Sequence, residues 1–195
     1  TTEDYLAFLL DGSGAKFGTD RLCIAVGRIP VSSESEAAVS VEKIRRYMAD
    51  EHRSEWKNRI VMATDDGNYG DHIDQMEKVY TEFMSTTGGL QNVYHKVYVD
   101  AFPLINGQTP DAHDRMWRLL NQGAIWWWYI GHASTTSWTA EGLLTIDDIH
   151  NARFTNPPML FAATCNFLRW DTPDESGAET LFFNENGIIG AIAAT

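Results

Sequence analysis

The sequence has few cysteines, few basic residues and no long apolar run. Two cysteines in 195 residues, Cys23 and Cys165, are too few for a disulfide framework. No apolar run approaches the roughly 18 to 20 residues that a membrane-spanning helix needs. Basic side chains number 15 against 27 acidic ones, and the formal net charge is -12. The chain therefore lacks the basic surface that nucleic-acid binding requires, and we expect no nucleic-acid partner.

The rest of the composition is that of an ordinary globular chain. Hydrophobic residues make up 44% and charged residues 22%. A chain of this length fits one domain, so we predict a single domain over residues 1–195. The final run, GIIGAIAAT, has the pattern of a buried strand that stops without a turn or a polar tail. We expect the chain to be a fragment of a longer protein, truncated at its C-terminus.

Short apolar runs alternate with longer stretches of helical periodicity, which is typical of a parallel sheet covered by helices. The predicted strands are 5–10, 22–29, 59–63, 95–99, 124–130, 158–164 and 188–193. The predicted helices are 35–51, 71–86, 111–122, 145–152 and 177–186. The pattern predicts an α/β fold, a three-layer α/β/α sandwich with a mostly parallel sheet.

Two reactive side chains directly follow predicted strands. The strand at 124–130 leads into Gly131 and His132, and the strand at 158–164 leads into Cys165. A crossover helix between these strands makes them parallel, so both residues fall at the edge of the sheet where ligands gather. A thiolate attacks carbonyl groups, and an imidazole can take the thiol proton and return it to a leaving amine. Cys165 and His132 are therefore candidates for a nucleophile and its proton partner.

Small residues beside this pair suit an oxyanion site. Gly131 and Ala133 leave the backbone open to a ligand, so we predict that the N–H groups of Ala133 and Cys165 stabilise a tetrahedral oxyanion. The plainer alternative is that Cys165 is an inert buried residue and His132 a polar surface group. Spacing alone leaves both interpretations open.

The residues around this pair resemble a known family. The runs YIGHASTTSW and FAATCNF are similar to the Tyr-x-Gly-His-Gly and Ala-x-Cys motifs of gingipain-like cysteine peptidases, family C25. Further runs, among them IAVGRIPVSSESEA and EGLLTIDDI, resemble the sortase branch of the type IX secretion system in Bacteroidetes. The resemblance covers nearly the whole chain. It implies a caspase-like fold and a cysteine peptidase or transpeptidase that forms an acyl-enzyme.

The same resemblance implies partners and a location. The expected substrates are polypeptides, the C-terminal sorting domains of exported proteins, and the expected partners are outer-membrane proteins of the secretion machinery. The expected location is the cell surface or the extracellular space, in association with the outer membrane. No cofactor is implied as a requirement, although structural calcium fits the resemblance because gingipains bind this ion.

Acidic residues after the strand at 59–63 supply the remaining site candidates. Matching MATDDGN to the gingipain pattern puts Asp66 at the place of the acid that orients the histidine, with Asp65 as the alternative. An ordinary acidic turn would also explain both residues. The resemblance further offers Asp71 or His72 for substrate binding, although an acid at the start of a helix also suits the helix dipole.

Three positions near the reactive residues carry open questions. Trp138 is expected to wall a substrate cleft, as is Trp170, although packing beneath the loops would explain both. Ala133 stands where the family pattern has glycine, and a positive φ angle there would put activity in doubt.

Other kinds of site and function are less well supported. The acidic group at 65–74 does not match the spacing of a calcium loop or a zinc motif, so no catalytic metal is predicted. An inactive caspase-like binding module of the secretion machinery remains the main alternative to an enzyme. A flavodoxin-like ligand binder would leave His132 and Cys165 at neighbouring strand ends unexplained.

Overall fold

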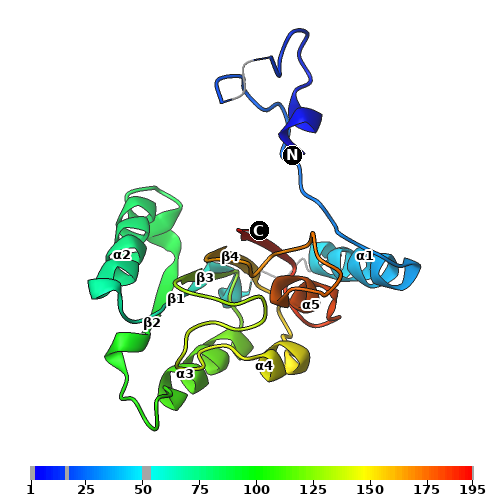
Figure 1. Cartoon of the computed structure of the whole chain (residues 1–195). Helices are drawn as coiled ribbons and strands as arrows, with labels where there is room; N and C mark the ends of the chain where they lie inside the picture. Colours follow the sequence, from blue (N-terminus) through cyan, green and yellow to red (C-terminus); the bar gives the residue numbers. More distant parts are fainter. Residues whose placement is uncertain (1–2, 16–17, 50–53, 195) are drawn as a thin grey trace. The chain divides into compact units, whose positions relative to one another are not determined.

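The computed structural model describes residues 3–15, 18–49 and 54–194, and it divides into two compact units, Thr1–Ser32 and Ser33–Thr195. Figure 1 shows both units. The single domain predicted over residues 1–195 stays a prediction. Among the described helices, none has the length and apolar character needed to cross a bilayer.

The first unit contains one short 3-10 helix, η1 (Glu3–Ala7), followed by turns and extended chain. The strands predicted at 5–10 and 22–29 are therefore wrong. An apolar run forms a strand only where a neighbour completes its backbone hydrogen bonds, and the described part of this unit contains no such ladder. Leu22, Ile24 and Val26 remain exposed instead.

The second unit is built on a five-stranded parallel sheet with the order β2-β1-β3-β4-β5. The strands are β1 (Arg59–Thr64), β2 (Val93–Tyr98), β3 (Trp126–Ile130), β4 (Met159–Ala163) and β5 (Gly190–Ala193). All strands predicted from residue 59 onward are present, with ends shifted by a few residues. Their parallel pairing confirms the predicted type of sheet.

Helices cover both faces of this sheet (Figure 1). On one face, Trp127 and Tyr129 of β3 share a core with Met116; on the other, Trp128 packs with Met76. Successive strand residues point to opposite faces, which explains how consecutive tryptophans are all accommodated. The predicted α/β sandwich is confirmed.

The helices of this unit are α1 (Glu34–Ala49), α2 (Asp71–Met84), α3 (Pro110–Asn121), α4 (Ile146–Asn151) and α5 (Gly177–Phe183). The short 3-10 turns are η2 (Glu55–Asn58), η3 (Asn68–Gly70), η4 (Gly89–Gln91) and η5 (Val99–Ala101).

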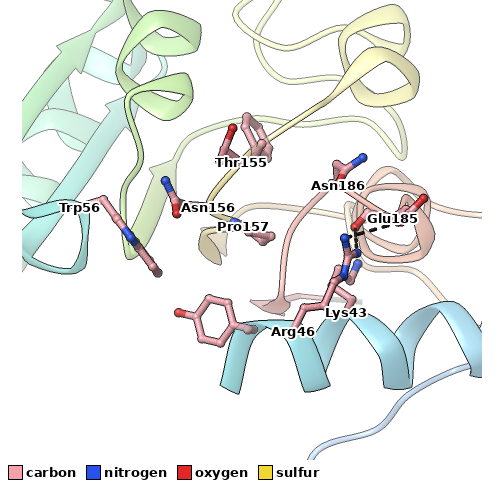
Figure 2. Close-up of a pocket in the computed structure, with 10 residues that line it drawn as sticks. Lys43, Arg46, Trp56, Thr155, Asn156, Pro157, Glu185 and Asn186 are labelled. Atoms are coloured by element: carbon pink, nitrogen blue, oxygen red, sulfur yellow. Dashed lines mark hydrogen bonds and ion pairs between the residues drawn. The ribbon is translucent and has the colours of Figure 1, made fainter. Parts of the chain in front are cut away.

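Lys43 links helix α1 to the C-terminal end of α5 through hydrogen bonds. The Lys43 ammonium group donates hydrogen bonds to the carbonyl oxygens of Phe182 and Asn184. Burial, with a smaller effect of Arg46, lowers the pKa of Lys43 to about 8. A pocket of about 190 Å³ lies beside this contact, and Trp56 is one of the residues that line it. Figure 2 shows these residues. Since Trp56 precedes β1, the pocket lies at the amino ends of the strands, away from His132 and Cys165.

A histidine links helices α3 and α4. His113 Nε2 lies 3.0 Å from Asp148 Oδ1, and this hydrogen bond is the main cause of a raised pKa for His113. The folded protein therefore holds the His113 proton more tightly than the unfolded chain. The resulting stabilisation is fully present below the ordinary histidine pKa of about 6.5 and is lost as the pH rises through the raised folded value.

We expect His113→Gln to lower the free energy of unfolding by about 1 kcal/mol at mildly acidic pH, and by clearly less at alkaline pH, where the histidine is neutral. Urea unfolding at the two pH values measures this difference. The exposed His150 of α4 provides a control, since His150→Gln should have no comparable effect. An equal loss for His113→Gln at both pH values would contradict the role of the charged pair.

Candidate active site

The carboxyl ends of β1 and β3 lie where the strand order reverses. The chain leaves β1 for β2 on one side and then returns to β3 on the other side of β1. In open α/β sheets, such a switch point is where ligands bind, just outside the carboxyl ends of the strands. Asp65 follows β1 and Gly131 and His132 follow β3, so these residues border the crevice that the topology creates.

His132 and Cys165 occupy equivalent positions beyond two paired strands. In the parallel ladder of β3 and β4, Ile130 is the partner of Ala163, and each reactive residue lies two positions further along. The ladder continues past β3, because the Gly131 N–H donates to the Ala163 carbonyl at 3.4 Å. Neighbouring parallel strands lie about 4.8 Å apart, so the strand ends from which His132 and Cys165 continue are neighbours. Both residues are exposed at this edge.

Buried polar groups hold the backbone of His132 on both sides. The Asp65 carboxylate accepts a hydrogen bond from the His132 N–H at 2.9 Å, and the Tyr129 hydroxyl donates to the His132 carbonyl at 2.6 Å. Burial raises the pKa of Asp65, and the N–H groups of His132 and Asp66 oppose that rise. Burial also raises the pKa of Tyr129 well above its ordinary value, so its hydroxyl stays a donor.

The imidazole of His132 meets a side chain that the sequence did not single out. Asn68 Nδ2 lies 3.1 Å from His132 Nε2 and 3.3 Å from His72 Nε2. The two imidazole rings are edge to face, with centroids 5.0 Å apart. The sequence signal for Asn68 was its place in the MATDDGN run, directly after Gly67.

Asp66, which was predicted to orient His132, lies beside Asp65, the alternative candidate for that role. The Asp66 N–H donates to Asp65 Oδ1 at 3.0 Å. Within the described ranges, no hydrogen bond or ion pair joins the Asp66 carboxylate to His132. Asp65 contacts the backbone of His132 rather than its ring. The orienting role of Asp66 therefore stays a prediction that no contact in the structure supports.

The three residues expected to bind substrate have different environments. Trp138 is fully buried and stacks on Tyr129, with ring centroids 4.0 Å apart, so the expectation that its side chain walls a cleft is wrong. It instead supports the tyrosine that holds His132. His72 is only 8% exposed and faces His132. Asp71 is exposed at the start of α2, where a substrate can reach it.

The two predicted oxyanion donors are unengaged. Ala133 lies opposite Trp138 in an isolated antiparallel bridge. The hydrogen bonds of this bridge come from neighbouring residues: the Ser134 N–H donates to the Ser137 carbonyl, and the Thr139 N–H donates to the His132 carbonyl. The described part of the chain shows no hydrogen-bond acceptor for the N–H of Ala133 or of Cys165. Ala133 is not among the residues with positive φ, so alanine in place of glycine causes no backbone strain here. The oxyanion role itself stays a prediction.

Three carboxylates gather beneath His132. One oxygen each from Asp65, Asp66 and Glu141 lie within 4.8 Å of one another. The Glu141 Oε2 atom is buried and has no hydrogen-bond partner in the described structure. A donor set made only of carboxylate oxygens fits a hard cation such as Ca²⁺ better than zinc.

The fold and these residues together define a class of protein. It is an α/β sandwich in which a histidine and a cysteine follow the carboxyl ends of two neighbouring parallel strands. The model of peptidase family C25 matches residues 1–195, and the chain therefore belongs to this family.

Solved structures share this fold. The Arg-specific cysteine proteinase gingipain R (RgpB) has a TM-score of 0.63 and 18% identity, and the match covers 86% of this chain and 41% of that chain. The complex of Porphyromonas gingivalis RgpB pro- and mature domains has a TM-score of 0.62 and 18% identity, covering 84% and 38%. The chain thus spans less than half the length of these proteins. No curated protein matches it.

The absence of a side chain at Gly131 is a requirement of the site. A Cβ atom at this position would lie 2.4 Å from the Asp65 Cβ and 2.5 Å from the Tyr129 hydroxyl oxygen. We expect Gly131→Ala to lower the free energy of unfolding by about 1 to 3 kcal/mol, because both groups that hold His132 must move. Denaturant unfolding measures the change.

A matched substitution is available at Gly88. Its φ angle is -68, and a Cβ there would meet nothing within 4 Å, so Gly88→Ala should be close to neutral. Equal stability of the two alanine variants would show that Gly131 is not closely packed.

Proposed function

We propose that the protein is a cysteine endopeptidase that acts through Cys165 and His132. The observation that carries the proposal is the equivalent position of these residues beyond the paired ends of β3 and β4. Membership of peptidase family C25 supports it. The exposure of both residues allows a polypeptide to reach them.

The proposed reaction passes through an acyl-enzyme. His132 takes the proton of the Cys165 thiol, and Sγ attacks the carbonyl carbon of the scissile bond. The N–H groups of Ala133 and Cys165 stabilise the resulting oxyanion. As the C–N bond breaks, His132 gives its proton to the leaving amine, and a thioester remains on Cys165. Water or an amine then attacks the thioester and releases the thiol.

The buried groups around His132 keep its main chain in place during these steps. Asp65 and Tyr129 fix the backbone of His132 from opposite sides, so the imidazole changes its protonation state without moving its main chain. Such preorganisation lowers the barrier, because the reacting groups need no reorientation in the transition state. Asp71, exposed nearby at the start of α2, is the side chain we propose for contact with the substrate.

We further propose that the substrates are C-terminal sorting domains of proteins exported by the type IX secretion system. The supporting observation is the sequence resemblance to the surface sortase usually called PorU. In this reaction an amine acceptor at the cell surface takes the acyl group, and the enzyme works at the outer membrane with partners of the secretion machinery. Mass spectrometry of the products formed with and without an added amine distinguishes transfer from hydrolysis.

A peptide acyloxymethyl ketone probe tests the peptidase proposal. We expect the probe to label the protein at Cys165. We also expect Cys165→Ser to abolish labelling and His132→Ala to slow it by about 100-fold or more, because the proton acceptor is lost. Intact-mass spectrometry and peptide mapping measure the extent and the position of labelling.

Cys23 supplies the matched control thiol. It is free and exposed like Cys165, but it lies in the first unit of the chain, so Cys23→Ser should leave labelling unchanged. Labelling of both thiols at equal rates would mean that Cys165 is not activated. A protein that the probe does not label would instead be the inactive binding module.

We also propose that Asp65, Asp66 and Glu141 hold a structural calcium ion. A bound Ca²⁺ would supply the missing partner of the buried Glu141 oxygen and relieve repulsion among the three carboxylates. We expect calcium chloride at about millimolar concentration to raise the melting temperature by several degrees, through binding to the folded state. Calorimetry with and without calcium measures the shift.

Variants assign that shift to the cluster. Glu141→Gln should remove most of it, while Asp147→Asn, at an exposed acid of α4, should retain it. A shift of the same size in both variants would place the ion elsewhere.

A further inference from the structure

The turn between β1 and α2 has an unusual backbone. Four consecutive residues have positive φ angles: Gly67 at 74, Asn68 at 44, Tyr69 at 57 and Gly70 at 86. Glycine adopts this region readily and asparagine tolerates it, but for a residue such as tyrosine it costs about 1 kcal/mol or more. Strain of this kind persists mainly where the conformation serves a site.

The turn presents the Asn68 amide to two imidazole rings. The amide nitrogen, as placed, lies 3.1 Å from His132 Nε2 and 3.3 Å from His72 Nε2. His72 belongs to the first turn of α2 and is only 8% exposed, so the surrounding residues limit the movement of its ring. The exposed side chain of Asn68 thus bridges His72 of the helix and the candidate catalytic histidine.

The orientation of this amide decides which nitrogen of His132 carries the proton. A half turn exchanges the amide nitrogen and oxygen without moving the side chain. With nitrogen toward the rings, Asn68 donates to both Nε2 atoms, and the proton of a neutral His132 sits on Nδ1. With oxygen toward the rings, its two lone pairs accept from both Nε2–H groups, and Nδ1 of His132 is free to accept a proton.

We propose that Asn68 is the positioning residue of the candidate peptidase, holding His132 through its side-chain oxygen in the tautomer that carries its proton on Nε2. This inference rests on the proposed function and deepens it, since it assigns to Asn68 the role that the sequence assigned to Asp66. The Asn68 amide touches the ring of His132, whereas Asp66 has no contact with it among the described interactions.

The proton movements are balanced in this arrangement. The Cys165 thiol proton passes to Nδ1 of His132 and gives an imidazolium ion whose Nε2–H remains donated to the Asn68 oxygen. That hydrogen bond strengthens as the ring becomes charged, because a charged donor binds a neutral oxygen more tightly. The Nδ1 proton then passes to the leaving amine, and the ring returns to its starting tautomer.

Substitutions at Asn68 can separate the side chain from the backbone. Asn68→Gly removes the amide and tolerates the positive φ angle, so it deletes the contact without adding strain. Asn68→Asp keeps an oxygen acceptor at the same place. Asn106 offers a matched control, since it is exposed and also has a positive φ angle, 53. Asn106→Gly makes the same change away from the site.

Labelling kinetics with the peptide acyloxymethyl ketone give the first readout. We expect Asn68→Gly to lower the maximal labelling rate by about 100-fold while changing the concentration for half-maximal rate less than about twofold. Asn68→Asp should recover at least about a tenth of the wild-type rate, and Asn106→Gly should match the wild type. A maximal rate for Asn68→Gly within about twofold of the wild type would overturn the proposal, as would equal losses in the glycine and aspartate variants.

A second readout does not depend on catalysis. Two-bond ¹H–¹⁵N spectra, recorded at a pH above the ordinary histidine titration, report which ring nitrogen of His132 carries its proton. We expect the proton on Nε2 in the wild type and a mixture of tautomers in Asn68→Gly. A proton on Nδ1, or a spectrum that Asn68→Gly leaves unchanged, would overturn the role of Asn68. A wild type with the expected tautomer but no labelling would support the positioning role and reject the peptidase proposal.

Discussion

The parallel pairing of β3 with β4 is the constraint on which the site depends. Both strands bury side chains on the face shared with α3, as Trp127 and Leu160 show. Because alternate residues point to opposite faces, a slip of one residue in either strand would move these side chains into the core on the opposite face, so packing on both faces determines the register. Hydrophobic packing in the middle of the sheet thereby sets the positions of His132 and Cys165 at its edge.

Buried polar groups further fix the backbone position of His132, which the strand register sets first. The Asp65 carboxylate reaches across from the end of β1 to the His132 N–H, and the Tyr129 hydroxyl reaches the His132 carbonyl from within the same segment. Trp138 returns beneath the loop and packs flat on Tyr129. The side chains of His132 and Cys165 are exposed, while Asp65 and Tyr129, which hold the main chain of His132, are buried.

The sequence predicted much of the fold, and the strand ends at which His132 and Cys165 lie, for one physical reason. Alternating apolar runs and helical stretches indicate a parallel sheet, and residues that follow strands gather at one edge of it. That argument placed His132 and Cys165 after neighbouring strands, and the pairing of β3 with β4 agrees with it. It failed in the first unit, where the run at 22–29 has the composition of a strand but no partner in the described structure.

The supporting residues could not be predicted, because their roles depend on loop geometry. Asn68 reaches His132 through a turn of positive φ angles, and nothing in the run MATDDGN distinguishes it from the neighbouring acids. Trp138 follows the reactive histidine closely enough to suggest a surface position. Instead, Trp138 forms isolated antiparallel β-bridges with Ala133 and with Leu144, and its side chain packs in the core. Proximity in sequence was therefore a poor guide to exposure.

The central claim is that His132 and Cys165 are side by side, and a disulfide trap tests it most directly. Parallel neighbours about 4.8 Å apart fall within the usual Cα separation of disulfides. In a protein carrying His132→Cys and Cys23→Ser, mild oxidation should join the introduced thiol to Cys165, and neither thiol should then react with an alkylating agent after unfolding. Two thiols that remain alkylatable after oxidation would contradict the account.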